Sequence, residues 1–67
     1  MPPINFNKNL YKLSAIKSAI AAYKHLADFE LKQDKKYIKV FLKNIDKEIE
    51  FLIGDEFCNY ALWAMRE

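Results

Sequence analysis

The sequence predicts a small α+β fold, a two-layer β-α-β-β-α sandwich whose helices both cover one face of a small sheet. Apolar residues recur at helical spacing over residues 13–27 and again near the C-terminus, and between these segments they alternate with polar residues. The chain has 67 residues, 52% of them hydrophobic, and a single Cys. This length and composition predict one domain over residues 1–67 and exclude disordered and disulfide-stapled chains.

The N-terminal half is predicted to contain a short edge strand and a long helix. Ile4 and Phe6 alternate with Asn5 and Asn7, which indicates a strand over residues 3–7. A strand there would be joined through the following helix to a parallel neighbour by a right-handed crossover. The helix is expected over residues 10–27 with Asn9 as its N-cap, because its apolar stripe has helical spacing: Leu13, Ile16, Ala19, Ile20, Tyr23, Leu26 and Ala27.

The rest of the chain is predicted to form strands and a second helix. Residues 33–36 and 44–47 are typical of tight turns, and Gly54-Asp55 is expected to end the sheet and cap the helix. The elements are strands at 29–32, 37–43 and 48–53, and a helix at 55–66. The sequence leaves open whether the first strand, at residues 3–7, exists.

The turns also predict a register and a buried face for the sheet. A turn centred on Asp34-Lys35 places Leu31 opposite Ile38, and one centred on Ile45-Asp46 places Phe41 opposite Glu50. Both registers give one wholly apolar face: Phe29, Leu31, Ile38, Val40, Leu42, Ile49, Phe51 and Ile53. The final helix would cover it with Phe57, Tyr60, Ala61 and Ala64.

Four residues are candidates for an interface: Tyr37, Phe41, Leu52 and Trp63. The first three lie among charged residues on the second sheet face, which no remaining element covers. Either Lys stems cover them or they form a dimer or peptide-binding face. Trp63 falls outside the buried stripe of its helix, so it either covers a core edge or anchors a partner.

A homodimer is the expected assembly, and a peptide or protein partner is also compatible with the sequence. A domain this small, without a disulfide or an evident metal, gains stability from exceptional packing or from a partner. An open strand edge is a further candidate surface, because an extended peptide can pair with its main chain. The opposing hypothesis is that Lys residues or the N-terminal segment protect this edge.

The sequence contains no catalytic, cofactor-binding or metal-ligating cluster, so we expect a protein that is not an enzyme. His25, the only His, lies roughly 10 Å along the helix from Ser18, too far for a hydrogen bond. Asp28 could orient the His25 ring, although such a pair is usually a solvated contact. Cys58 lies beside the buried stripe and is typical of a small hydrophobic residue. One His and one Cys cannot supply a structural zinc site.

Charge and hydropathy argue against nucleic acid and membrane partners. The formal net charge is only +2. Tyr37 and Phe41 do interleave with Lys39 and Lys43, as in platforms for single-stranded nucleic acid, but Glu30, Glu48 and Glu50 share their predicted face. The longest apolar run, residues 60–65, is far below the roughly 20 residues that cross a bilayer. No signal peptide is evident and the lone Cys suits a reducing compartment, so a cytoplasmic location is expected.

A family resemblance adds to these expectations. Ala21-Ala22-Tyr23 ends the first helix, and after a hairpin Glu56-Phe57-Cys58-Asn59 opens the last one, followed by Leu62 and Arg66. From about residue 4 to residue 66 this order resembles the HxsD-like family. The resemblance implies an accessory protein of the His-Xaa-Ser system, which is associated with radical SAM enzymes thought to modify a small repeat-containing peptide. It implies no catalytic residue.

The leading interpretation is therefore an adaptor that binds a peptide or a radical SAM maturation enzyme. Two alternatives remain open. One is a small nucleic-acid-binding or regulatory protein. The other is a subunit of a multi-chain enzyme, in which His25, Ser18 or Asp28 would face a pocket of the partner.

Overall fold

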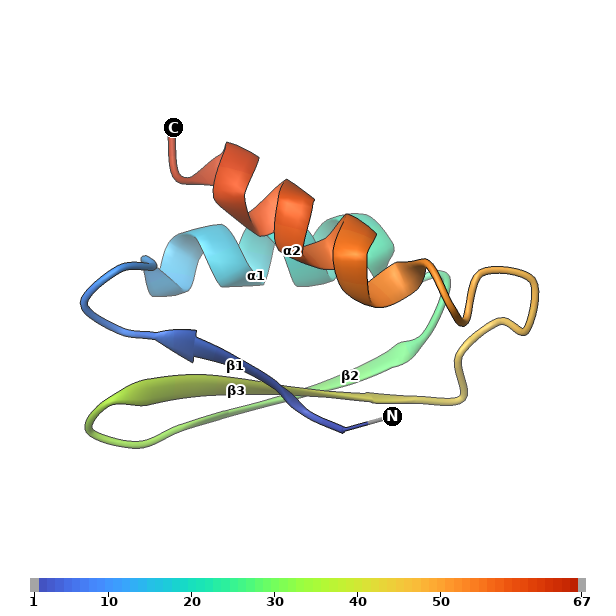
Figure 1. Cartoon of the computed structure of the whole chain (residues 1–67), viewed down its shortest axis with the longest axis horizontal. Helices are drawn as coiled ribbons and strands as arrows, with labels where there is room; N and C mark the ends of the chain where they lie inside the picture. Colours follow the sequence, from blue (N-terminus) through green and yellow to red (C-terminus); the bar gives the residue numbers. More distant parts are fainter. Residues whose placement is uncertain (1, 67) are drawn as a thin grey trace.

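The computed structural model describes residues 2–66 and confirms the α+β class and the β-α-β-β-α order (Figure 1). Both helices lie on the same side of the sheet, so the molecule has two layers. The elements are β1 (Ile4–Asn7), α1 (Leu13–Tyr23), β2 (Asp28–Gln33), β3 (Tyr37–Lys43) and α2 (Ile53–Ala64).

The three strands are ordered β1-β3-β2, and both pairs are antiparallel. The predicted edge strand near residue 4 is confirmed, but the predicted parallel neighbour is wrong. β1 and β2 run in the same direction, with β3 inserted between them. Ile4 lies opposite Val40 and Phe6 opposite Ile38, so β1 adds its apolar residues to the core face of β3.

The hairpin of β2 and β3 is confirmed, but its register differs from the prediction by two residues. Leu31 lies opposite Val40, and Gln33 lies opposite Ile38. The turn between them is held by Asp34, whose Oδ1 accepts hydrogen bonds of 2.8 Å from the main-chain N–H groups of Lys36 and Tyr37. These bonds lower the pKa of Asp34. A shift of two residues keeps every side chain on its predicted face.

The predicted strand at 48–53 is wrong, because the chain turns away from the sheet after β3. Asn44 has a left-handed backbone (φ 52°), and the chain then coils through a segment of turns at residues 47–52. The N–H of Ile49 donates to the carbonyl oxygen of Asp46 at 3.1 Å, and that of Leu52 donates to Ile49 at 2.9 Å. β1 occupies the edge of β3 where this strand would have paired. The predicted pairing of Phe41 with Glu50 is therefore also wrong.

Both helices are confirmed with shifted ends. α1 is shorter than predicted because it begins only after Lys12, and the chain leaves it after Tyr23 to enter β2. The predicted Asn9 N-cap is wrong: the N–H of Asn9 instead donates to Asn7 Oδ1 at 2.8 Å in the turn after β1. α2 begins two residues earlier than predicted, so Gly54 lies in its first turn.

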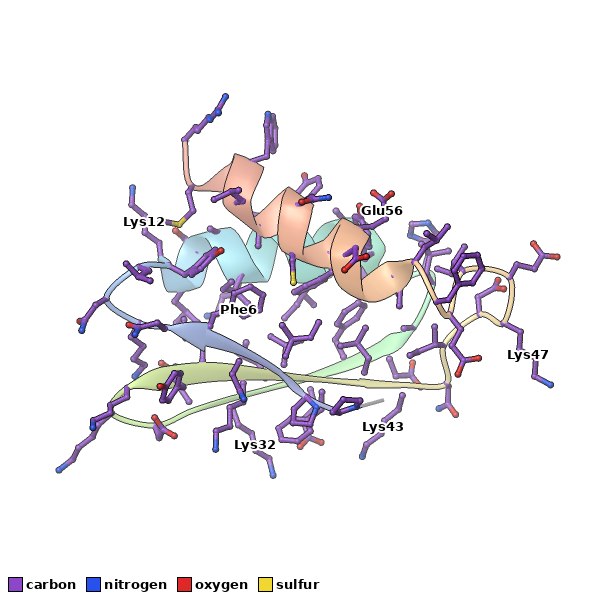
Figure 2. The ribbon with its side chains drawn as sticks, viewed as in Figure 1. Phe6, Lys12, Lys32, Lys43, Lys47 and Glu56 are labelled. Atoms are coloured by element: carbon purple, nitrogen blue, oxygen red, sulfur yellow. The ribbon has the colours of Figure 1, made fainter. Side chains whose placement is uncertain are left out.

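The core lies between the sheet and the helices, with the fully buried ring of Phe57 near its centre. This ring packs against Phe29 (centroids 5.3 Å apart), Phe6 (6.1 Å) and Tyr23 (6.2 Å). Phe6 points toward the helices, whereas Lys32 and Lys43 project from the opposite face of the sheet (Figure 2). Most of the predicted apolar face is buried or half-buried, but Phe51 is not: its side chain is 79% exposed in the turn segment.

Candidate functional site

The four candidate interface residues lie in three separate places. Tyr37 and Phe41 lie on the outer face of β3, the face opposite the helices. Leu52 immediately precedes α2 and Trp63 lies in its last turn, both in the helix layer. The structure therefore does not bring the four residues together into one surface.

The outer sheet face is open to solvent, since no described element covers it (Figure 1). Phe41 is half-buried, and the Nζ of Lys32 lies 5.6 Å from the centroid of its ring. The carboxylate of Glu30 lies 3.3 Å from Lys32 Nζ and 4.0 Å from Lys43 Nζ. Glu48 and Glu50, which were expected on this face, lie instead in the turn segment. The face is consequently less acidic than the sequence suggested.

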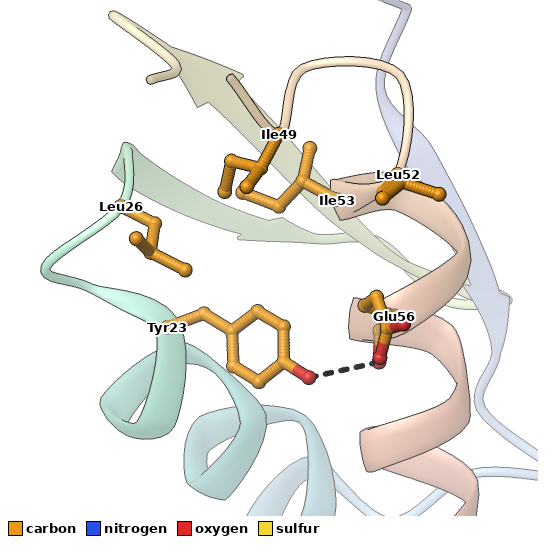
Figure 3. Close-up of a pocket in the computed structure, with 6 residues that line it drawn as sticks. All are labelled: Tyr23, Leu26, Ile49, Leu52, Ile53 and Glu56. Atoms are coloured by element: carbon orange, nitrogen blue, oxygen red, sulfur yellow. Dashed lines mark hydrogen bonds between the residues drawn. The ribbon is translucent and has the colours of Figure 1, made fainter. Parts of the chain in front are cut away.

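An apolar groove of about 270 Å³ lies at the other side of the molecule, where α1 ends and α2 begins (Figure 3). Its lining comes from three parts of the chain: the end of α1 and the turn after it, the turn segment, and the first turn of α2. The lining residues are Tyr23, Leu26, Ile49, Leu52, Ile53 and Glu56. Leu52 is 44% exposed, and Phe51 precedes it in the chain.

Tyr23 holds one wall of this groove in place. Its ring packs edge-on against Phe57 and Tyr60, with centroids 6.2 Å and 5.7 Å away. Its hydroxyl donates a hydrogen bond of 3.3 Å to the main-chain carbonyl oxygen of Glu56 (Figure 3). Burial of the hydroxyl raises the pKa of Tyr23, and the charges of Glu56 and Tyr60 raise it further.

The elements that form the groove carry more acidic than basic side chains, four carboxylates against Lys24 and Lys47. Asp55 and Glu56 lie in the first turn of α2, where the positive end of the helix dipole favours carboxylates. Glu48 and Glu50 are exposed in the turn segment. The groove thus combines apolar walls with carboxylates on the elements that form it.

A second, shallower hollow of about 170 Å³ lies on α2, lined by Asn59, Leu62, Trp63 and Arg66. The Trp63 ring packs against Tyr60 with centroids 5.4 Å apart, yet 51% of Trp63 remains exposed. Trp63 therefore covers the edge of Tyr60 and also presents a free surface.

The residues considered for chemistry do not converge. Ser18 and His25 are both exposed, and Asp28 accepts a hydrogen bond of 2.7 Å from Asn44 Nδ2. Cys58 is half-buried, and burial followed by the charge of Asp55 raises the pKa of its thiol, which disfavours the reactive thiolate. Within residues 2–66 no group of three or more His, Cys, Asp or Glu side chains could hold a metal ion.

Sequence reasoning missed the groove, although one signal for it was present. Ile49, Ile53 and Phe57 recur at intervals of four, so the helical apolar spacing extends back from α2 into the turn segment. Assigning that segment to a strand concealed this periodicity. Neither described helix is long and apolar enough to span a membrane. Comparisons with family models, curated proteins and solved structures found no match to this chain.

Proposed function

We propose that this protein is a non-enzymatic binding module that receives an apolar side chain of a partner polypeptide in the groove between α1 and α2. One observation supports the proposal above the others. The groove has walls of Leu26, Ile49, Leu52 and Ile53, and Phe51, which precedes Leu52 in the chain, is 79% exposed. Concave apolar surface of this kind commonly marks an interaction site.

The carboxylates suggest what flanks that apolar side chain in the partner. Glu56 lines the groove, and Glu48, Glu50 and Asp55 belong to the same elements. The partner segment is therefore expected to carry an aromatic or aliphatic anchor beside Lys or Arg, because opposite charges favour encounter and orientation.

Selection of peptides from a random displayed library on the immobilised protein tests this proposal. Selected peptides should share an apolar anchor with a basic neighbour, and they should shift the NMR signals of Leu26, Ile49 and Leu52. Leu52→Glu should abolish their binding, since it places a carboxylate at the groove wall. Leu62→Glu is the matched control, because Leu62 is 59% exposed on α2 but lies outside the groove. Peptides that bind the Leu52→Glu variant unchanged would contradict the proposal.

The resemblance to the HxsD-like family suggests a more specific role, as a cytoplasmic adaptor for a radical SAM enzyme that modifies a peptide. This suggestion rests on Tyr23, Glu56 and Phe57, which belong to the residue pattern that resembles the family. Tyr23 and Glu56 line the groove. Co-purification with a radical SAM enzyme encoded beside its gene, lost in Leu52→Glu, is the expected result. The absence of such an enzyme from the gene neighbourhood would remove this support.

A second candidate function is the binding of single-stranded nucleic acid on the outer sheet face. Tyr37 and Phe41 lie there with Lys32, Lys39 and Lys43. Glu48 and Glu50 lie in the turn segment and not on this face. Aromatic rings can stack on bases while Lys contacts phosphates. Binding of a labelled oligonucleotide should weaken with added salt and with Phe41→Ser. Affinity that Phe41→Ser leaves unchanged would exclude this face.

A further inference from the structure

The outer edge of β2 presents unpaired main-chain groups. The N–H of Asp34 donates to the carbonyl oxygen of Tyr37 at 3.0 Å, which makes these two residues a hydrogen-bonded pair of the hairpin. In an antiparallel ladder such pairs alternate, so the residues of β2 bonded to β3 are Asp28, Glu30 and Lys32. The N–H and C=O groups of Phe29, Leu31 and Gln33 therefore point away from β3.

The other edge of the sheet is less available for pairing. On β1, the Lys8 N–H donates a hydrogen bond of 2.9 Å to the Lys36 carbonyl oxygen, so Lys8 is bonded to the strand beside it. Because bonded residues alternate along the ladder, the main-chain groups of Asn5 and Asn7 point outward. The Asn7 carbonyl already accepts hydrogen bonds from Leu10 (3.0 Å) and Tyr11 (2.9 Å). Pro2 and Pro3 precede the strand and cannot donate. The six residues of β2 include no proline, and none of its outward groups is used in a turn. Among the described residues, no other segment forms main-chain hydrogen bonds to these outward groups.

We propose that two copies of this chain pair through their β2 strands, antiparallel and about a two-fold axis at Leu31, which joins the two sheets into one of six strands. The Leu31 residues of the two copies would lie opposite each other, and Phe29 would lie opposite Gln33 of the other copy. All of these residues have outward main-chain groups, so the pairing forms about six intermolecular hydrogen bonds. Leu31 and Phe29, half-buried at the free edge, would become more fully covered.

The charges along β2 favour this register, and they favour a second copy of the same strand as the partner. With the axis at Leu31, Glu30 of each copy faces Lys32 of the other, giving two attractive cross-strand pairs. An axis at Glu30 would oppose Glu30 to itself, and one at Lys32 would oppose Lys32 to itself. An axis between residues would place apolar side chains opposite polar ones. The two unfavourable pairs, Asp28 of each copy with Asp34 of the other, lie beyond the ladder, and the Asp34 carboxylate is 3.7 Å from Lys39 of its own chain.

Charge reversal on β2 provides the test. Sedimentation equilibrium of the full chain should show the 7.9 kDa mass doubling as its concentration rises from about 10 µM to about 1 mM. Glu30→Lys and Lys32→Glu should each weaken dimerisation about tenfold or more, because each turns two attractive pairs into repulsive ones. An equimolar mixture of the two variants should restore a dimer, since each Lys at position 30 or 32 then faces Glu.

Lys17→Glu is the matched control, because it makes the same charge change as Lys32→Glu at an exposed position of α1. It should leave the dimer intact. Thermal unfolding confirms that each variant is folded. A second readout is amide exchange: the N–H groups of Phe29, Leu31 and Gln33 should gain protection with concentration, whereas Glu30 and Lys32 are protected throughout.

Three outcomes would overturn the proposal: a monomer at every concentration, a dimer indifferent to the charge reversals, or a mixture that does not associate. A monomer whose β2 amides shift only with an added extended peptide would assign the edge to a foreign strand instead. The proposal is independent of the groove, because no groove residue belongs to β2. Leu52→Glu should leave the dimer intact, and Glu30→Lys should leave peptide binding to the groove unchanged.

Discussion

The hydroxyl of Tyr23 on α1 donates a hydrogen bond of 3.3 Å to the main-chain carbonyl oxygen of Glu56 on α2. The bond joins residues from opposite halves of the chain at the point where the two helices border the apolar groove. At the other end of the pair, Lys12 N–H lies 3.1 Å from the sulfur of Met65, so the helices run in opposite directions side by side. Tyr23 therefore contributes both to helix packing and to the shape of the proposed binding site.

Tyr23→Phe should lower the free energy of unfolding by about 0.5–1.5 kcal/mol at neutral pH, because it removes this hydrogen bond while keeping the ring. It should also change the response to alkali. The pKa of Tyr23 is raised in the folded state, so its contribution is complete below the ordinary value of 10.0 and is lost as the pH rises through the folded value. Urea denaturation between about pH 8 and pH 11 measures both effects.

The matched control for this experiment is Tyr37→Phe, since Tyr37 is 41% exposed on the outer face of the sheet. The wild type and Tyr37→Phe should lose stability in alkali more steeply than Tyr23→Phe. If the free energy of unfolding falls equally steeply with pH in all three proteins, the pKa of the Tyr23 hydroxyl is the same in the folded and the unfolded state.

Two phenylalanines distinguish the observed fold from the one with a strand at 48–53. Phe57→Ala should destabilise the protein by about 3–5 kcal/mol, which is enough to unfold a domain of this size, because the ring is fully buried. Phe51→Ser should change the free energy of unfolding by less than about 0.5 kcal/mol, because its ring is 79% exposed. Circular dichroism shows whether each variant is folded, and urea denaturation measures its free energy of unfolding. A Phe51→Ser variant that unfolds would place Phe51 in the core.

The left-handed backbone of Asn44 directs the chain away from β3. Asn44→Ala should lower stability by about 1–2 kcal/mol, because a Cβ disfavours φ of 52° unless the side chain compensates locally, and the 2.7 Å bond to Asp28 is lost. Asn44→Gly should lose less, since Gly adopts this φ readily. Asp28→Ala removes the same hydrogen bond without altering the backbone. If Asn44→Ala and Asp28→Ala have equal effects, the backbone conformation contributes nothing.

Cys58 is expected to react slowly with thiol reagents. Its pKa is raised by burial and then by the charge of Asp55, so less thiolate is present at pH 8 than in a free cysteine. The rate of modification by a disulfide reagent, compared with that of a short Cys peptide, measures this. In Asp55→Asn the rate should rise modestly. A wild-type rate equal to that of the peptide would contradict the expected protection.

The elements set by local patterns were largely predictable. Ile16 and Ala19 in α1, and Phe57 and Ala61 in α2, are buried as their helical spacing predicts. The alternation of Ile38, Val40 and Leu42 likewise identified β3 and its buried face. Of the candidate interface, Leu52 alone lines the larger groove, and Trp63 lines the smaller hollow.

By itself, the sequence determined the α+β class and the faces that α1, β3 and α2 bury, because these follow from spacing along a single segment. The tertiary structure decided which segment pairs with the second edge of β3. Both residues 48–53 and residues 4–7 carry alternating apolar side chains, but one edge accepts only one strand. Once β1 holds that edge, the later segment coils into turns that expose Phe51 and place Ile49 and Leu52 in the groove. Periodicity along the chain does not decide this competition between distant segments, because residues 48–53 alternate like a strand while Ile49, Ile53 and Phe57 also fit a helical spacing. The groove therefore became evident only in the folded structure.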